Sequence, residues 1–268
     1  MANSINTNYG AAIALQNLNK TNAALETTQN RVNTGMKVSS AKDNGAIFAI
    51  ATTQRANMGA MDAVKNSLQR GQSIVDVALA AGDTATSALE EMKALAVNIA
   101  SSTGDAQVAY LADYNALGKE VASALSGASF DGVNLWTTAA LTNLTTNTSG
   151  GTYGVGFAAA PSADAALTAV NTGAVTAANA TVANVDAAIK KVTDSLATLG
   201  TQSKSVGRQI TFVNKLQDAT EAGIGNLVDA DLAKESAKLT ALQTKQQLGV
   251  QALSIANSSS SILLSLFR

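Results

Sequence analysis

The sequence predicts a mainly α-helical protein made of long, coiled-coil-like rods in which N-terminal and C-terminal segments pair, with a small β-hairpin and a short variable middle region. Three observations predict this fold class. Apolar residues recur at spacings of three and four over long stretches, only 4% of the 268 residues are aromatic, and Pro161 is the only proline. Helix interiors exclude proline, and an apolar set rich in alanine suits thin helical rods better than one thick core.

The expected segments form a nested plan. Residues 1–40 supply the N-terminal half of a terminal helical pair, and residues 227–268 supply its C-terminal half. Residues 41–136 and 183–226 form the two parts of an inner helical unit. Residues 137–182 hold the hairpin and a short variable outer segment. We therefore expect the two chain ends to meet and the long inner helices to pack on each other.

Both ends of the chain carry narrow apolar stripes with a period of seven. The residues concerned are Leu18, Leu25 and Val32 near the start, Leu232, Leu239, Gln246 and Leu253 near the end, and Leu263 in a second row of the C-terminal helix. An isolated helix is marginally stable in water, so each stripe needs a partner. Because the stripes are thin and the last residues, ILLSLF, are apolar, we expect the terminal pair to be completed by assembly with other molecules.

The inner unit carries the longest periodic signal. Its expected packing residues are Val64, Leu68, Val75, Leu89 and Met92 in the first part and Val185, Ile189, Val192, Leu196 and Ile210 in the second. Spacings of three and four in alternation average 3.5, which is typical of a coiled-coil contact. A further helix follows the first, with Tyr110 and Val121 on one face. We expect this unit to fold by itself.

Two stretches interrupt the helices. Residues 33–46 contain two glycines and should form a turn or ordered linker, followed by a helix capped by Ser40, Asp43 or Asn44. Residues 141–145 and 152–157 flank the turn sequence NTSGG, and Tyr153, Val155 and Phe157 alternate with glycines, which predicts a β-hairpin. We expect the remainder of the middle, through Pro161, to be a surface loop or a small exposed excursion.

Composition excludes several functions. The chain has no histidine and no cysteine, which removes imidazole bases, thiolate nucleophiles and nearly all transition-metal sites. We expect no catalytic residue, cofactor or metal, and interpret Asp229 and Asp231 as helix-terminal groups rather than an acid–base pair. A net charge of −1 with no cluster of Lys and Arg argues against nucleic acid. We find no stretch of about 20 apolar residues that would span a membrane and expect no cleaved secretory signal.

Several motifs stand in order at both ends. They are INTN at 5–8, LQNLNKTNAAL at 15–25, SAKDNGA at 40–46, SFDGVNLW at 129–136, DADLAKE at 229–235 and ILLSLFR at 262–268. Together they resemble the bacterial flagellin family over roughly residues 1–157 and 183–268. The middle is short for that family and is where its members diverge.

The resemblance implies a structural subunit of the flagellar filament that polymerises with identical or sibling flagellins. In such a subunit the terminal helices line a central channel, the inner helical unit forms the tube wall, and the middle faces outward. The resemblance also implies unfolded export through the flagellar type III apparatus, secretion to the extracellular flagellum, and growth beneath a filament cap. A flagellar export chaperone is expected to hold residues 229–268, and junction proteins of the hook are expected as further partners.

One segment departs from the family pattern. Residues 89–98, LEEMKALAVN, correspond to a region that an animal innate receptor recognises in many flagellins, where the family motif carries two arginines and a glutamate. Glu91, Lys93 and Ala94 stand at those positions here. Replacing a guanidinium by a carboxylate reverses the charge and removes its fork of donors, so we expect weak activation of that receptor.

Two other interpretations remain open from the sequence. A hook–filament junction protein, or another axial flagellar protein, shares similar terminal helices, although the retained SFDGVNLW motif and inner rods favour flagellin. A generic coiled-coil binding module would explain the heptads but not why both ends are unfinished.

Overall fold

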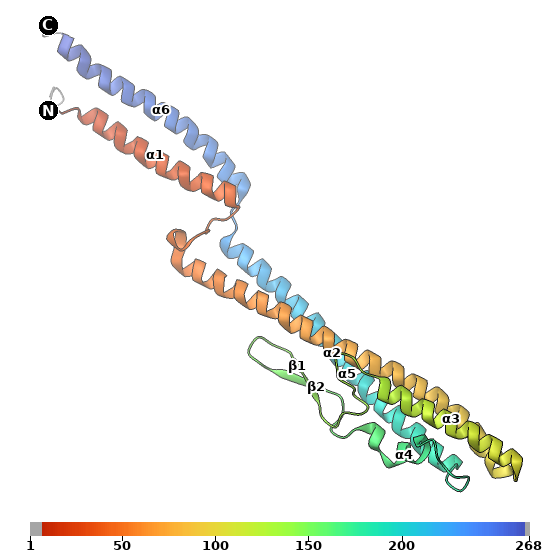
Figure 1. The fold of residues 1–268 in the computed structure, drawn as a ribbon. Coiled ribbons are helices and arrows are strands. Elements are labelled where there is room, and N and C mark those ends of the chain that lie inside the picture. The colour runs from red at the N-terminus through yellow and green to blue at the C-terminus, as the bar shows by residue number, and fades with distance from the viewer. Residues whose placement is uncertain (1–6, 266–268) are drawn as a thin grey trace. The chain divides into compact units, whose positions relative to one another are not determined.

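The computed structural model describes residues 7–265, and side chains through residue 258. Its helices are α1 (Tyr9–Thr34), α2 (Ala41–Ser101), α3 (Asp105–Gly127), α4 (Ala165–Asn171), α5 (Val182–Val228) and α6 (Leu232–Ser265), and its strands are β1 (Thr142–Thr145) and β2 (Thr152–Val155), with a short 3₁₀ turn η1 (Pro161–Ala163) (Figure 1). The predicted mainly α fold with a small hairpin is confirmed.

The described chain divides into two compact units. The first contains the residues up to Ala56 and those from Ala219 onward, and the second contains Asn57–Asp218. These limits lie inside α2 and α5, whereas the boundaries expected from the sequence, at 40/41 and 226/227, lie close to helix ends.

In the first unit, α1 and α6 lie side by side (Figure 1). The side chain of Asn8 caps α1, because its Oδ1 accepts a hydrogen bond from the backbone N–H of Ala11 at 3.0 Å. Gly35 ends α1 in the left-handed conformation, at φ +70°, which glycine adopts without the steric cost a side chain would bring. Both ends of α1 are therefore encoded locally.

The two linkers of the first unit pair with each other. Met36 and Asp229 form an antiparallel bridge, the N–H of Lys37 donates to the carbonyl of Val228 at 2.7 Å, and the N–H of Ala230 donates to the carbonyl of Gly35 at 2.8 Å. Val228 is almost fully buried in this unit. The bridge holds the linker that follows α1 beside the linker that precedes α6.

Asn44 interrupts the first turn of α2, and the continuous helical part of α2 starts after it. Asn44 is extended, at φ −162° and ψ 102°, and its Oδ1 accepts from the N–H of Ile47 at 3.1 Å, so it is the cap of the long helical part of α2. Asp43 instead accepts from the backbone N–H and hydroxyl groups of Ser39 and Ser40. Hydrogen bonds from Ser39 and then Ser40 lower the pKa of Asp43, because they stabilise its charged form.

The second unit closes a core around α2, α3 and α5. Its fully buried side chains include Leu68, Val75, Leu89 and Met92 of α2, Tyr114, Val121 and Leu125 of α3, and Val185, Val192, Leu199 and Val206 of α5. α3 starts after Gly104, which has a positive φ of +67°. Three helices thus shield apolar stripes that two helices would leave partly open.

Two glycines of α2, Gly71 and Gly82, leave space for side chains from the chain that follows α3, and we call each such space a socket. A Cβ at Gly71 would overlap the side chain of Leu144, and a Cβ at Gly82 would lie 2.7 Å from Trp136 Cζ2 and 2.5 Å from Leu196 Cδ2. Trp136 is fully buried, and its Nε1–H donates to the carbonyl of Ala78 at 2.8 Å. These glycines admit side chains of the hairpin region as well as of a neighbouring helix.

The predicted hairpin is present. β1 and β2 pair antiparallel, with Leu144 opposite Tyr153 and Thr145 opposite Thr152. Asn147 shapes the turn, because its Oδ1 accepts from the N–H of Ser149 at 3.0 Å and of Gly151 at 2.7 Å. Gln202 of α5 holds the far end of the hairpin through two hydrogen bonds with the backbone of Gly156.

The expectation of a surface loop after the hairpin is wrong. Pro161 is buried at the start of η1, Leu167 and Val170 of α4 are fully buried, and Val175 and Ala180 are nearly so. The side-chain amide of Asn115 in α3 pairs with both the N–H and the carbonyl of Val175. Because α4 has only seven residues and two large apolar side chains, its helical period is too short to stand out in an alanine-rich sequence.

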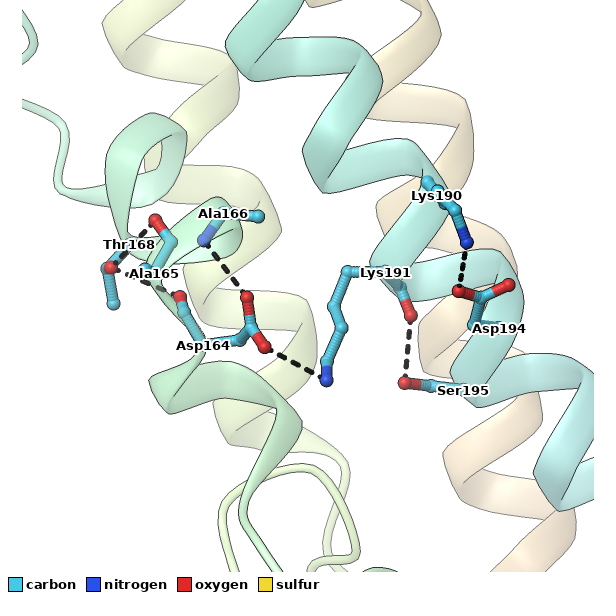
Figure 2. A network of polar contacts seen from close by, with 8 residues as sticks. All are labelled: Asp164, Ala165, Ala166, Thr168, Lys190, Lys191, Asp194 and Ser195. Atoms are coloured by element: carbon cyan, nitrogen blue, oxygen red, sulfur yellow. Dashed lines mark hydrogen bonds and ion pairs between the residues drawn. The ribbon is translucent and has the colours of Figure 1, made fainter.

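A polar network attaches α4 to α5 (Figure 2). Asp164 caps α4 through the N–H of Ala166 at 3.0 Å, and its other carboxylate oxygen pairs with Lys191 Nζ at 2.9 Å. The hydrogen bond with Lys191 and that from Ala166 lower the pKa of Asp164. Figure 2 also shows the hydroxyl of buried Ser195 donating to the carbonyl of Lys191, which satisfies this hydroxyl within α5.

Candidate assembly surfaces

The α1–α6 pair has a contact face that is only half covered. On α6 the partly buried positions follow heptad spacing: Glu235, Leu239, Leu242, Gln246, Gly249, Leu253 and Ala256. On α1 the corresponding positions are Ala11, Ala14, Leu18, Thr21, Leu25, Thr28 and Val32, of which only Thr28 is fully buried. The structure therefore brings both predicted terminal stripes together without closing a core around them.

Three polar contacts set the register of this pair. Asn8 Nδ2 donates to the carbonyl of Ala256 at 2.8 Å, and Gln246 Nε2 donates to Asn22 Oδ1 at 2.8 Å. At the other end, Arg31 Nη1 pairs with Glu235 Oε1 at 3.1 Å. The contacts run in opposite order along the two helices, so the helices are antiparallel. Polar residues at contact positions specify register because a slip would separate their partners.

The Arg31–Glu235 contact is enclosed on one side. The Glu235 side chain is 12% exposed, and its second carboxylate oxygen, Arg31 Nε and the hydroxyl of fully buried Thr28 have no partner among the described residues. Unsatisfied buried polar atoms cost free energy. This end of the pair therefore contains polar atoms that the pair itself does not satisfy.

Apolar side chains on the outer faces of the terminal pair have no cover within the described chain. They include Tyr9, Ile13 and Leu15 of α1 and Leu232, Leu248, Val250 and Ile255 of α6, with Tyr9 at 77% exposure and Ile255 at 70%. Leu232, expected in the stripe, is 49% exposed and lies outside the helix–helix contact, whereas Leu263 lies beyond the residues whose side chains are described. Sequence reasoning missed Leu248, Val250 and Ile255, since they fall off the heptad row.

The structure places all ten of the expected inner-unit residues in or against one core. Val64, Leu68, Val75, Leu89, Met92, Val185 and Val192 are buried, and Ile189, Leu196 and Ile210 pack against them partly buried. Ala188 and Ser195 take the central positions of α5 that the sequence assigns to Ile189 and Leu196. The contact face of α5 is therefore turned toward its smaller residues.

The segment that departs from the family pattern lies on the surface of α2. Glu91, Lys93 and Ala94 are exposed, while Met92 between them is fully buried. Lys93 Nζ pairs with Asp186 of α5 at 2.6 Å. The lysine is engaged within the chain, so Glu91 dominates the charge presented here.

The described residues offer no metal cluster, since no group of three or more acidic residues could hold an ion together. None of the helices in residues 7–265 is long and apolar enough to cross a membrane. What the described structure does present is contact surface: half-covered helix faces in one unit and a closed core in the other. Half-covered helix faces of this kind are typical of a structural subunit.

Comparison with known proteins gives the family. Residues 5–140 match the bacterial flagellin N-terminal helical region, and residues 182–267 match the bacterial flagellin C-terminal helical region. Flagellin FljM of Caulobacter vibrioides is 54% identical over 271 residues that cover 99% of both chains, and Flagellin FljK of the same bacterium is 53% identical over the same length. A flagellin of Brucella melitensis is 37% identical over 279 residues. The chain belongs to the bacterial flagellins, a family of structural proteins, and is a subunit of the extracellular flagellar filament.

Proposed function

We propose that this flagellin polymerises through its terminal helical pair, with identical or sibling subunits covering what one chain leaves exposed. The observation that carries the proposal is the half-buried face of α1 and α6, flanked by outward apolar side chains such as Leu248 and Ile255. Contiguous exposed apolar surface favours association, because burial releases roughly 25 cal/mol per Å². Leu18, Leu25, Val32, Leu239 and Leu253 are the proposed filament-core contacts, together with Leu232 and Leu263.

We further propose that the subunit is secreted by the flagellar type III apparatus in an unfolded state. The half-covered α1–α6 pair supports secretion in an unfolded state, since this pair does not need a stable structure before subunits assemble. Exposed apolar side chains of α6, such as Val250, support binding of an export chaperone to residues 229–268 before secretion. The filament cap and the hook junction proteins are the proposed partners at the two ends of the filament.

We propose no catalytic role. Asp231 is explained by helix capping, because its Oδ1 accepts from the N–H of Lys234 at 3.1 Å at the start of α6. Asp229 lies in the linker bridge. Both candidate carboxylates thus have structural roles.

For the animal receptor, we propose weak recognition of the surface around Glu91. That surface presents a carboxylate, a lysine paired to Asp186 and the methyl group of Ala94. None of these offers the planar fork of an arginine. A reporter cell exposed to purified monomer should respond weakly, and a strong response at low concentration would contradict the proposal.

The test of polymerisation is electron microscopy of purified, heat-dissociated protein after slow cooling with short filament seeds. Long tubes of uniform diameter are expected. Persistent monomers with protease-sensitive ends would contradict self-assembly and favour a junction protein.

A further inference from the structure

A groove between α2 and α3 in the second unit has an apolar floor and acidic sides. It is lined by Leu95, Leu117, Ala94 and Ala116, with Glu91 on one side and Asp113 on the other. Leu95 and Leu117 are partly buried, and the two acids are exposed. Lys93, the neighbouring cation on α2, is paired with Asp186, and Lys119 of α3 lies along Gly173. The groove is therefore negative as well as apolar.

The opposite combination occurs on α5. Lys204, Arg208, Phe212 and Lys215 stand four, four and three residues apart, so they share one face of the helix, which we call the basic stripe. All four are exposed, and Phe212 is 59% exposed between Arg208 and Lys215. Among the side chains that the structure describes, none of the three cations forms an ion pair. A large aromatic ring flanked by cations lies open to solvent.

The stripe cannot reach the groove of its own chain. Gln72 of α2 bonds Ser203 of α5 at 2.7 Å, and Lys93 pairs with Asp186, so the two helices run antiparallel. The stripe begins beside Gln72, while the groove lies at the level of Lys93, about 20 residues further along α2, or roughly 30 Å at ~1.5 Å per residue. Only another molecule can bring the two together.

We propose that the basic stripe of one subunit docks in the acidic groove of a second copy of this chain, with Phe212 on Leu95 and Leu117, and Arg208 and Lys215 toward Glu91 and Asp113. The two surfaces are different patches, so the contact is heterologous, and repeating it builds an open helical array wherever the rotation between subunits does not close a ring. Complementary charges fix the partner and the register of such a contact. The inference rests on the proposed polymerisation and names a contact outside the terminal pair.

Charge reversal tests the contact with the full chain. The groove variant carries Glu91→Lys and Asp113→Lys, and the stripe variant carries Arg208→Glu and Lys215→Glu. Each alone places like charges together and should raise the concentration needed for seeded assembly at least about tenfold. An equimolar mixture restores opposite charges at every contact, since each variant's groove then faces the other's stripe, and should assemble within about threefold of the unmodified chain. Asp83→Lys, an exposed reversal on α2 outside the groove, is the control and should assemble normally.

The outcomes separate this inference from polymerisation itself. Filaments of the unmodified chain establish polymerisation whatever the variants do. Normal assembly of either variant alone, or failure of the mixture to recover, overturns the docking contact. If circular dichroism shows that a charge variant has lost helix, Phe212→Ala decides: a raised assembly concentration supports the contact, and an unchanged one overturns it.

Discussion

The two units use the same heptad pattern and reach different degrees of burial. In the second unit, α3 and the α4 segment cover the stripes of α2 and α5, and large side chains such as Trp136 and Leu89 are fully buried. In the first unit, α1 and α6 have only each other, and Leu18 and Leu239 stay half-buried. The same helical period therefore serves two purposes. It forms a closed core where further helices cover the stripes, and it leaves a contact surface where no further helix does.

This comparison also separates folding from assembly. A closed core stabilises a chain by itself, whereas a two-helix contact is marginal in water until further surface is buried. Substitutions in the terminal pair should therefore affect filaments most, and substitutions in the second unit should affect the stability of the monomer.

Leu239→Asp should have the largest effect. It places a charge on the contact face of α6, where assembly would bury it without a partner, so filament formation should be abolished. The helical content of residues 50–220 should stay nearly unchanged by circular dichroism. Normal filaments from this variant would show that the face is not an assembly contact.

Trp136→Ala should have the next largest effect, confined to the second unit. It empties the socket above Gly82 and removes the hydrogen bond to Ala78, which should lower the free energy of unfolding by about 3–5 kcal/mol. Urea unfolding followed by circular dichroism measures it. Leu232→Ala, at an exposed position, is the control and should change monomer stability by less than about 0.5 kcal/mol. Equal losses of unfolding free energy in both variants would contradict the difference in burial between the two units.

Glu235→Ala should have an intermediate effect on the filament. It leaves Arg31 without its partner at the enclosed end of the pair and should weaken filament stability by about 1–3 kcal/mol per subunit. A double-mutant cycle with Arg31→Ala, read out by thermal depolymerisation, isolates the contribution of the pair. Strict additivity of the two losses would show that the contact does not couple α1 to α6.

Tyr114→Phe should have the smallest effect and the opposite sign. The Tyr114 hydroxyl is buried without a partner among the described residues, so its removal should raise the free energy of unfolding by up to about 1 kcal/mol. Burial raises the pKa of Tyr114 to about 12. Because the unfolded chain ionises this phenol near pH 10 and the folded chain only near pH 12, the fold keeps its full stability below about pH 10 and loses stability as the pH rises from about 10 to about 12.

Urea unfolding at several pH values across that interval checks this prediction. The Tyr114→Phe chain should lose less stability there than the unmodified chain, while Tyr110→Phe, at a more exposed position, should behave as the unmodified chain does. Equal losses in all three chains would show that Tyr114 does not titrate as its burial requires.

The sequence predicted the parts of the fold that repeat or are locally encoded. Val64 to Met92 keep the heptad period over many turns, and NTSGG carries its own turn chemistry, so both could be placed without tertiary information. The α4 segment was missed because Leu167 and Val170 alone do not define a period. The occupant of the Gly71 socket, Leu144, depends on how the hairpin folds back, which no local pattern encodes.

The contact surfaces were predicted in part. Heptad spacing located the face shared by α1 and α6, but it does not show that Leu232 lies outside that face, because a straight helix drifts about 20° per heptad from a strict seven-residue row and Leu232 stands at the end of that row. The acidic groove is formed by residues of two helices about 20 positions apart in sequence, and only their packing brings Glu91 and Asp113 to its two sides.

Hydrogen exchange on the monomer and on the filament tests the central claim most directly. In the monomer, we predict fast exchange for the amides of α1 and of residues 232–258, and slow exchange for residues 64–99 and 185–213. In the filament, both sets should exchange slowly, because other subunits then cover the terminal pair. Equal protection of the terminal pair and the second unit in the monomer would contradict the account.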